Sequence, residues 1–360
     1  MIYTNSRDKC SYRKLDMKIK LIALLFFSFF IATCSTNISQ SENINVIALT
    51  TNTPEEALPP TIESTITPSV TEVSFPNYPS GEIILHEAGG EGEYNYWSYV
   101  PKNLPSSEET YILLDISHPQ IEDYHDLTAQ AKYNISMFVE ISEKENFILL
   151  TPVIPRDFSE GYYPQGINEY SLNPSTPFFF YRPDLKVNII IDQFVKELDE
   201  KGYSVNKKIF VSGFSAGGMW ANRYTLLHPE RVKAAAIGSA GGWLTMPVYE
   251  FNGINLRWPL GLYNYLELTG NEYDKFDALK SVPMLIYIGD EDTESTYFSK
   301  YPSHDLINIW GISDPDRFEN QYKYLVDIGY DVSFKLYPNV AHRYTDQMIL
   351  DVINFLVQNK

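Results

Sequence analysis

The stretch KIFVSGFSAGGMWANRY, residues 208–224, constrains the fold of this chain more than any other. It begins with a short apolar run, Ile209 to Val211, that ends at a Ser-Gly pair, which is typical of a buried strand. The pentapeptide Gly-Phe-Ser-Ala-Gly and a helix-compatible segment follow. This order predicts a sharp strand–turn–helix connection, in which glycines at 213 and 217 avoid clashes around Ser215.

Such a turn suits a serine that acts as a nucleophile. Its central residue takes a strained backbone conformation, so the Ser215 hydroxyl would stand above the sheet. The N–H of Ala216 would lie at the start of the next helix and point toward a developing oxyanion. We therefore expect Ser215 to attack the substrate and Ala216 to be one oxyanion donor.

Strand patterns and helical patterns alternate across residues 81–360, which we expect to form one folded domain. This alternation predicts an α/β fold with a mainly parallel central sheet flanked by helices on both faces. Active sites of such sheets lie beyond the carboxyl ends of the strands. The expected strands are 94–100, 111–117, 145–155, 209–211, 232–240, 283–289 and 331–338, and the clearest helices are 185–198 and about 345–357.

A histidine and three carboxylates follow two of these strands. His342 comes after the last strand, and Asp290, Glu291 and Asp292 come directly after Gly289. A serine nucleophile needs a histidine to accept its proton and a carboxylate to orient the imidazole. Position alone leaves the carboxylate open, because Asp290 could instead bond backbone N–H groups of the turn.

Residues 95–360 resemble an α/β-hydrolase of the secreted esterase type, similar to polyhydroxybutyrate depolymerases and feruloyl esterases. The resemblance rests on YWSYVPKN at 96–103, GFSAGG at 213–218, PMLIYIGDEDT at 283–293 and YPNVAH at 337–342. It implies the α/β-hydrolase fold, no cofactor, and cleavage of carboxylic esters through an acyl-enzyme. It also implies that the acid lies three residues after the strand-ending glycine, which makes the catalytic set Ser215, Asp292 and His342.

One loop departs from the pattern of that family. The loop after the 111–117 strand usually reads His-Gly and donates a second oxyanion N–H, but here it reads Ser117-His118-Pro119-Gln120. Proline has no N–H to donate. Gln120 or His118 would therefore supply the second donor, and we assign it to Gln120.

The other histidines are expected to be surface residues, because His86 and His304 lie in loop-like sequence and His228 follows the elbow helix. Asp115, His118 and His125 could be drawn together as metal ligands, but their spacing matches no usual site. The sequence therefore predicts no metal and no cofactor.

Residues 1–34 are predicted to be a secretory signal rather than part of the fold. Lys18 and Lys20 precede an apolar run at 21–33, which is short for a transmembrane helix, and Cys34 follows in a lipobox-like context. We expect an extracytoplasmic lipoprotein, held on the cell surface by lipidated Cys34 or secreted. An uncleaved N-terminal anchor is the alternative.

Residues 35–80 are rich in Ser, Thr, Asn, Pro and Glu and predict a disordered tether. The formal net charge of the whole chain is −18, which argues against nucleic acid and anionic membrane surfaces as partners. The expected membrane contact is the lipid anchor alone.

Two aromatic-rich insertions, 158–184 and 243–268, would either shape substrate recognition or form a structural cap with its own small core. The expected substrate is an ester, carried on a polysaccharide or a polyester. Two alternatives remain: a serine peptidase of the same fold, and a surface carbohydrate-binding or adhesion protein that has lost activity.

Overall fold

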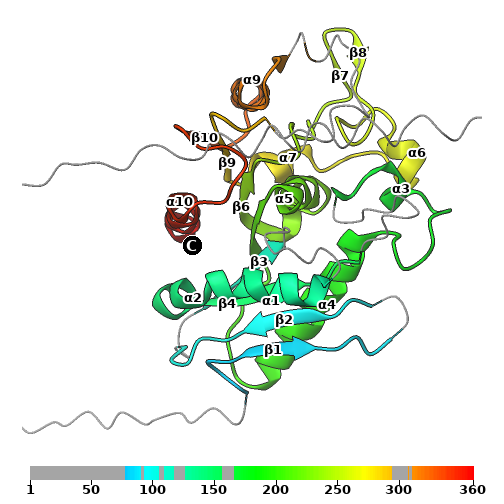
Figure 1. Ribbon diagram of the computed structural model, residues 1–360. Helices are drawn as coiled ribbons and strands as arrows, with labels where there is room; N and C mark the ends of the chain where they lie inside the picture. The colour runs from blue at the N-terminus through cyan, green and yellow to red at the C-terminus, as the bar shows by residue number, and fades with distance from the viewer. Residues whose placement is uncertain are drawn as a thin grey trace, which may run out of the picture. The chain divides into compact units, whose positions relative to one another are not determined.

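A computed structural model of the chain describes residues 78–90, 93–104, 109–116, 126–155, 166–293, 307 and 310–360 (Figure 1). All of these belong to one compact unit, Val70–Lys360. The predicted signal and nearly all of the predicted tether lie outside the described residues. Tyr78, close to the end of that tether, is buried, and its ring lies against Phe194 and Tyr203.

An eight-stranded sheet forms the centre of this unit, in the order β1-β2-β4-β3-β5-β6-β9-β10. Its strands are β1 (Ile83–His86), β2 (Tyr96–Tyr99), β3 (Tyr111–Ile116), β4 (Phe147–Pro152), β5 (Ile209–Phe214), β6 (Val232–Gly238), β9 (Met284–Gly289) and β10 (Val332–Tyr337). The pairs β1–β2 and β2–β4 are antiparallel, and every other neighbouring pair is parallel. The predicted mainly parallel sheet is therefore confirmed.

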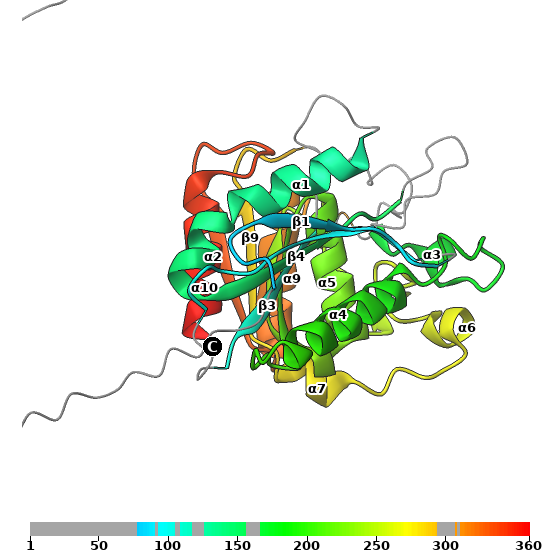
Figure 2. The same cartoon turned by 90° about the horizontal axis from the view of Figure 1, so that it is seen from below.

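Helices cover both faces of this sheet, as Figure 2 shows from below. One face carries α4 (Pro183–Glu200), α5 (Ala216–Leu227) and α9 (Asp314–Asp327), and the other carries α1 (Leu127–Met137), α2 (Val139–Glu145) and α10 (Asp346–Gln358). A separate hydrophobic cluster fills the space on each face, because the parallel strands present apolar side chains to both sides.

The helix α4 illustrates how the sequence specifies these layers. Val187, Ile191, Phe194 and Leu198 recur at helical spacing and are fully or nearly fully buried against the sheet. Proline occupies the first helical position, where its missing N–H is tolerated. The helix predicted at 185–198 is confirmed and extends two residues farther at each end.

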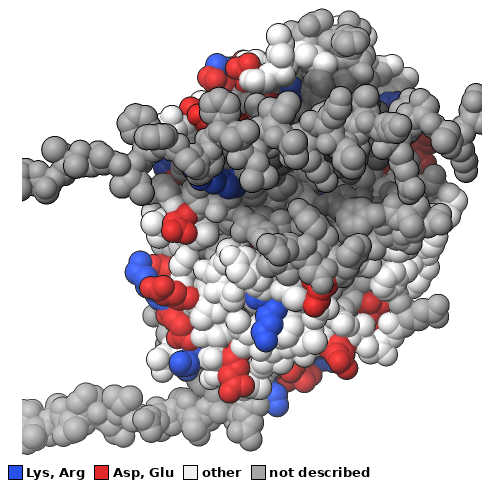
Figure 3. Space-filling view, viewed as in Figure 1, with Lys and Arg blue, Asp and Glu red and all other residues white. Residues whose placement is uncertain are grey.

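Smaller elements lie between the large ones. They are α3 (Glu169–Leu172), a 3₁₀ turn at Pro229–Arg231, the hairpin of β7 (Glu250–Phe251) and β8 (Ile254–Asn255), α6 (Tyr265–Thr269) and α7 (Phe276–Lys280). No helix in the described part of the chain is both long enough and apolar enough to span a bilayer. On the face drawn in Figure 3, acidic and basic side chains are interspersed over the region where Figure 1 draws α1, α2 and β1.

Candidate active site

The turn between β5 and α5 has the strained geometry expected of its sequence. Ser215 adopts φ 57° and ψ −117°, a conformation with positive φ that residues other than glycine rarely adopt. Its N–H donates to the Gly238 carbonyl at 2.9 Å, which ties the turn to β6. A Cβ at position 213 would overlap the backbone carbonyl of Gly217, and one at 217 would overlap that of Ile116. Only glycines fit both positions.

The structure brings His342 and Asp292 to this turn from the loops after β10 and β9. His342 Nε2 lies 2.8 Å from Ser215 Oγ, and His342 Nδ1 lies 2.9 Å from one Asp292 carboxylate oxygen and 3.1 Å from the other. A carboxylate accepts hydrogen bonds, so Nδ1 carries the proton and donates it to Asp292. Nε2 is then free to accept the proton of the serine hydroxyl.

Burial differs along this chain of hydrogen bonds. The Asp292 side chain is 2% exposed and the His342 side chain is 18% exposed. The carboxylate is thus enclosed on the protein side, while the imidazole retains access to the space above the sheet. The Phe214 ring packs against the His342 ring with centroids 5.1 Å apart and limits its rotation.

Asp290 has a different place in the same loop. Its carboxylate accepts from the Val340 N–H at 3.4 Å, and its own N–H donates to the Tyr337 carbonyl at 2.9 Å. The Glu291 N–H donates to the Val340 carbonyl at 3.1 Å. These bonds join the loops after β9 and β10. Asp290 therefore holds the backbone of the two loops together, whereas Asp292 contacts the histidine.

Of the two predicted oxyanion donors, the structure describes only Ala216. Ala216 is the first residue of α5 and is buried directly after Ser215, as its sequence position predicts. Gln120, like His118 and Pro119 of the same loop, lies outside the described residues. The second donor stays a prediction.

A buried polar cluster that the sequence analysis did not identify lies beneath the turn. Asp115 on β3 is fully enclosed and accepts from Asn134 Nδ2 on α1 at 3.0 Å. Asp115 pairs in register with Ser212 on the neighbouring strand β5. The Tyr344 ring stacks on Phe214 nearby. Burial raises the pKa of Asp115 to about 7, although the hydrogen bond from Asn134 acts to lower it. An aspartate inside the apolar run YILLDI was the available signal.

Two of the histidines predicted to be surface residues are placed elsewhere. His228 is 6% exposed, and its Nε2 donates to Asp184 at 2.8 Å. Burial opposes ionisation of Asp184, but the bonds from His228 and Arg182 outweigh it and lower the pKa of Asp184 to about 2. His86 lies in β1, half-buried, where its ring stacks on Tyr96. His304 lies outside the described residues.

The two aromatic insertions pack against each other through their described parts. Arg223 on α5 is buried and donates to Thr245 of one insertion and to the Gly166 carbonyl and Asn168 at the other. The Trp258 indole N–H donates to the Ile167 carbonyl at 2.7 Å. The 243–268 segment buries Trp243, Leu244, Met246, Leu256, Trp258 and Leu262, and all of these except Trp243 belong to the same hydrophobic cluster as α4, α5 and α9. The insertion therefore extends the main core and does not form a small core of its own. Phe178 and Phe179 of the first insertion remain exposed.

No group of three or more His, Cys, Asp or Glu side chains with metal-binding geometry occurs among the described residues. Of the three residues that the sequence suggested, the structure describes only Asp115. Asp115 is enclosed beneath the turn, whereas His118 and His125 fall outside the described residues.

Comparison with known proteins identifies the fold. No family model matches the sequence, and no curated protein matches it. Poly(aspartic acid) hydrolase-1 from Sphingomonas sp. KT-1 is similar in structure, with 18% identity, 78% of this chain and 99% of that chain covered, and a TM-score of 0.54. The siderophore hydrolase EstA from Aspergillus nidulans has 14% identity, coverage of 77% and 94%, and a TM-score of 0.46. The FphF serine hydrolase of Staphylococcus aureus has 15% identity, coverage of 78% and 99%, and a TM-score of 0.45.

At these identities the likeness extends to the fold. The strand order, the crossover helices and the turn after β5 agree with the α/β-hydrolase arrangement. In that arrangement the nucleophile lies on a sharp strand-to-helix turn, which in this chain is the turn after β5. The chain therefore has the α/β-hydrolase fold, and the prediction of that fold from the sequence is confirmed.

Proposed function

We propose that the protein is a serine hydrolase that cleaves carboxylic esters. The observation that carries the proposal is the continuous hydrogen-bonded series from Ser215 Oγ through His342 to Asp292, beginning at a residue with left-handed φ. The three groups are the hydroxyl, the imidazole and the carboxylate that acyl transfer requires. Each lies at the carboxyl end of a different parallel strand.

The proposed reaction has two stages. Ser215 Oγ attacks the acyl carbonyl while His342 Nε2 takes the hydroxyl proton and then delivers it to the leaving alcohol. Asp292 holds the imidazole in the required tautomer and stabilises its charged form. Water, activated by the same histidine, then hydrolyses the acyl-enzyme. The Ala216 N–H would stabilise the oxyanion in both stages.

A fluorophosphonate probe tests this proposal, because only an activated serine reacts rapidly with it. We expect rapid labelling of the wild-type protein and none of Ser215→Ala. Ser136→Ala, which removes an exposed hydroxyl from α1, should label like the wild type. Absence of labelling in the wild type would favour the non-catalytic carbohydrate-binding alternative instead.

A substrate panel then separates esters from peptides. We expect hydrolysis of acetyl, butyryl or feruloyl esters at rates well above those of peptide substrates. A preference for peptides would replace the esterase proposal with the peptidase alternative.

A further inference from the structure

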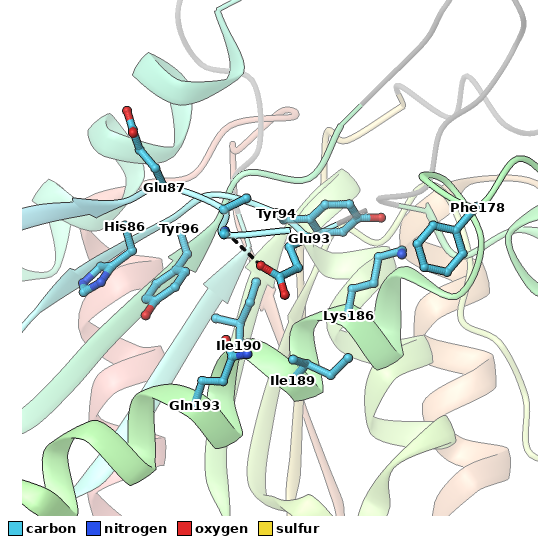
Figure 4. A pocket seen from close by; sticks show the side chains of 12 residues that line it. His86, Glu87, Glu93, Tyr94, Tyr96, Phe178, Lys186, Ile189, Ile190 and Gln193 are labelled. Carbon is cyan, nitrogen blue, oxygen red and sulfur yellow. Dashed lines mark hydrogen bonds between the residues drawn. The ribbon is translucent and has the colours of Figure 1, made fainter. Parts of the chain in front are cut away.

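A pocket of about 310 Å³ lies between the end of the β1–β2 hairpin, the first half of α4 and the loop before that helix (Figure 4). His86, Glu93, Tyr94, Tyr96, Phe178 and Lys186 line it, among others. None of these side chains belongs to the hydrogen-bonded series at Ser215. The pocket is therefore a separate feature of the fold.

Strand register places this pocket on the same edge of the sheet as Ser215. His86 pairs with Tyr96, and Tyr96 pairs with Pro152, the last residue of β4. The carboxyl ends of β3, β4 and β5 lie along this edge, and β4 and β3 separate β2 from β5. Three strand spacings amount to about 14 Å. A long substrate could occupy both places at once.

Lys186 is the unusual residue of the pocket. It is only 8% exposed, yet no carboxylate in the described part of the chain lies within ion-pair distance of its ammonium. The nearest charged group on the helix, Asp184, is instead paired with Arg182 and His228. Partial burial lowers the pKa of Lys186, because it disfavours the charged form of the ammonium.

The contacts of Lys186 offset only part of the cost of this burial. Its Nζ lies 3.8 Å from the centroid of the Phe178 ring and 5.9 Å from that of Tyr94. Cation–π contacts of this kind stabilise an ammonium group but supply no opposite charge. A ligand carboxylate would supply a counter-ion and a charge-assisted hydrogen bond. The ammonium thus favours an anionic ligand.

The other walls narrow the kind of anion. The Glu93 carboxylate, which accepts the Gly89 N–H at 2.9 Å, faces the same space, and the Gln193 amide lies at its rim. These oxygens can accept hydrogen bonds from hydroxyl groups. Ile189 and Ile190 form an apolar floor, and Phe178 is 64% exposed beside it. A ring with C–H faces and hydroxyl edges fits these surroundings better than a bare inorganic anion, which has no C–H face to lie against the apolar floor.

We propose that this pocket binds a uronic acid residue, a sugar ring that carries a carboxylate, with Lys186 on the carboxylate and Glu93 and Gln193 on the hydroxyls. This inference rests on the proposed function and deepens it. It makes the substrate an ester on an acidic polysaccharide, held by the pocket while Ser215 acts on a neighbouring unit.

Calorimetric titration of the purified full chain with glucuronate tests the site. We expect saturable binding of glucuronate and at least tenfold weaker binding of glucose, acetate and inorganic phosphate. Lys186→Gln should weaken glucuronate binding at least tenfold. Lys196→Gln, an exposed lysine on the same helix, should leave it unchanged. Equal binding of glucose, or of acetate, would overturn the proposal, as would unchanged binding by Lys186→Gln.

A second variant guards against a folding defect at Lys186. Phe178 is exposed, so Phe178→Ala should fold normally and still weaken glucuronate binding severalfold, because it removes a wall of the pocket. Unchanged affinity in this variant would also contradict the proposal.

Ser215→Ala distinguishes the two proposals. It should abolish ester cleavage and bind glucuronate as tightly as the wild type. If the wild type shows no esterase activity but binds glucuronate, the proposed function fails and the pocket stands. If it cleaves esters but does not bind glucuronate, only the pocket proposal fails. In an active enzyme, Lys186→Gln should raise KM for uronate-containing polymer esters, whereas Lys196→Gln should leave that KM unchanged.

Discussion

At the scale of single residues, the structure separates two aspartates that lie two positions apart. Asp292 contacts the imidazole of His342, whereas Asp290 bonds the backbone of the opposite loop. Asp292→Asn should favour the wrong tautomer of His342 and lower kcat by up to about 10⁴-fold. Asp290→Asn should lower kcat far less, since its amide oxygen can still accept the Val340 N–H. Steady-state kinetics of both variants on one ester decides, and a larger loss in Asp290→Asn would reverse the roles.

Asp115 makes stability depend on pH. Its pKa is raised to about 7 in the folded protein, so between about pH 4 and pH 7 the folded state binds more protons than the unfolded state. The stability contributed by the protonated carboxyl is therefore lost as the pH rises through 7. Between pH 5 and pH 8, Asp115→Asn should remove up to roughly 3 kcal/mol of this decline. Urea denaturation at pH 5 and pH 8 measures it, with exposed Asp327→Asn as a control that should retain the wild-type decline.

At the scale of elements, the β5–α5 turn depends on glycine. Gly213→Ala would force a Cβ into the Gly217 carbonyl, which belongs to the backbone and cannot rotate away. We expect a loss of about 3 kcal/mol or more in the free energy of unfolding. Gly89→Ala places a Cβ 3.6 Å from the Glu93 carboxylate and should change stability little. A stable Gly213→Ala protein would contradict this account of the turn.

The elements that sequence reasoning predicted share one property, which is an apolar pattern of their own. The helix α4 has a continuous apolar stripe, and β3, β4, β5 and β9 are apolar runs. The helix α1 has none, because its buried positions include the polar Gln130 and Asn134. The strand β1 is only four residues long and half-buried throughout. Such elements are specified by their partners and not by their own sequence.

The same distinction applies to the polar residues. Ser215, His342 and the carboxylates after Gly289 could be located because each follows a recognisable strand, and the rule on strand ends brings those positions together. The choice of Asp292 among these carboxylates came from the resemblance to secreted esterases. The pairing of His228 with Asp184 spans 44 residues and joins two helices, so no local pattern indicates it. Asp115 likewise depends on a contact from α1.

At the scale of the whole molecule, the open question is whether the protein is attached to a membrane. The predicted anchor lies in residues outside the described part of the chain. We propose that Cys34 is lipidated and holds the protein on a membrane. Cys34→Ala should then release the protein or block signal processing. Membrane fractionation and mass spectrometry of the N-terminus measure this. Unchanged membrane association with residues 1–33 still attached would support the uncleaved anchor.

The left-handed φ of Ser215 means that the residue which supplies the hydroxyl also strains the backbone. Ser215→Ala and Ser215→Gly both remove the hydroxyl, but only glycine adopts φ 57° without strain. The glycine variant should be the more stable of the two by about 1 kcal/mol or more, seen as a higher midpoint in thermal denaturation. Equal midpoints would contradict this. A serine at this position therefore lowers the stability of the fold, and the hydroxyl that the proposed reaction needs is the one group that glycine cannot replace.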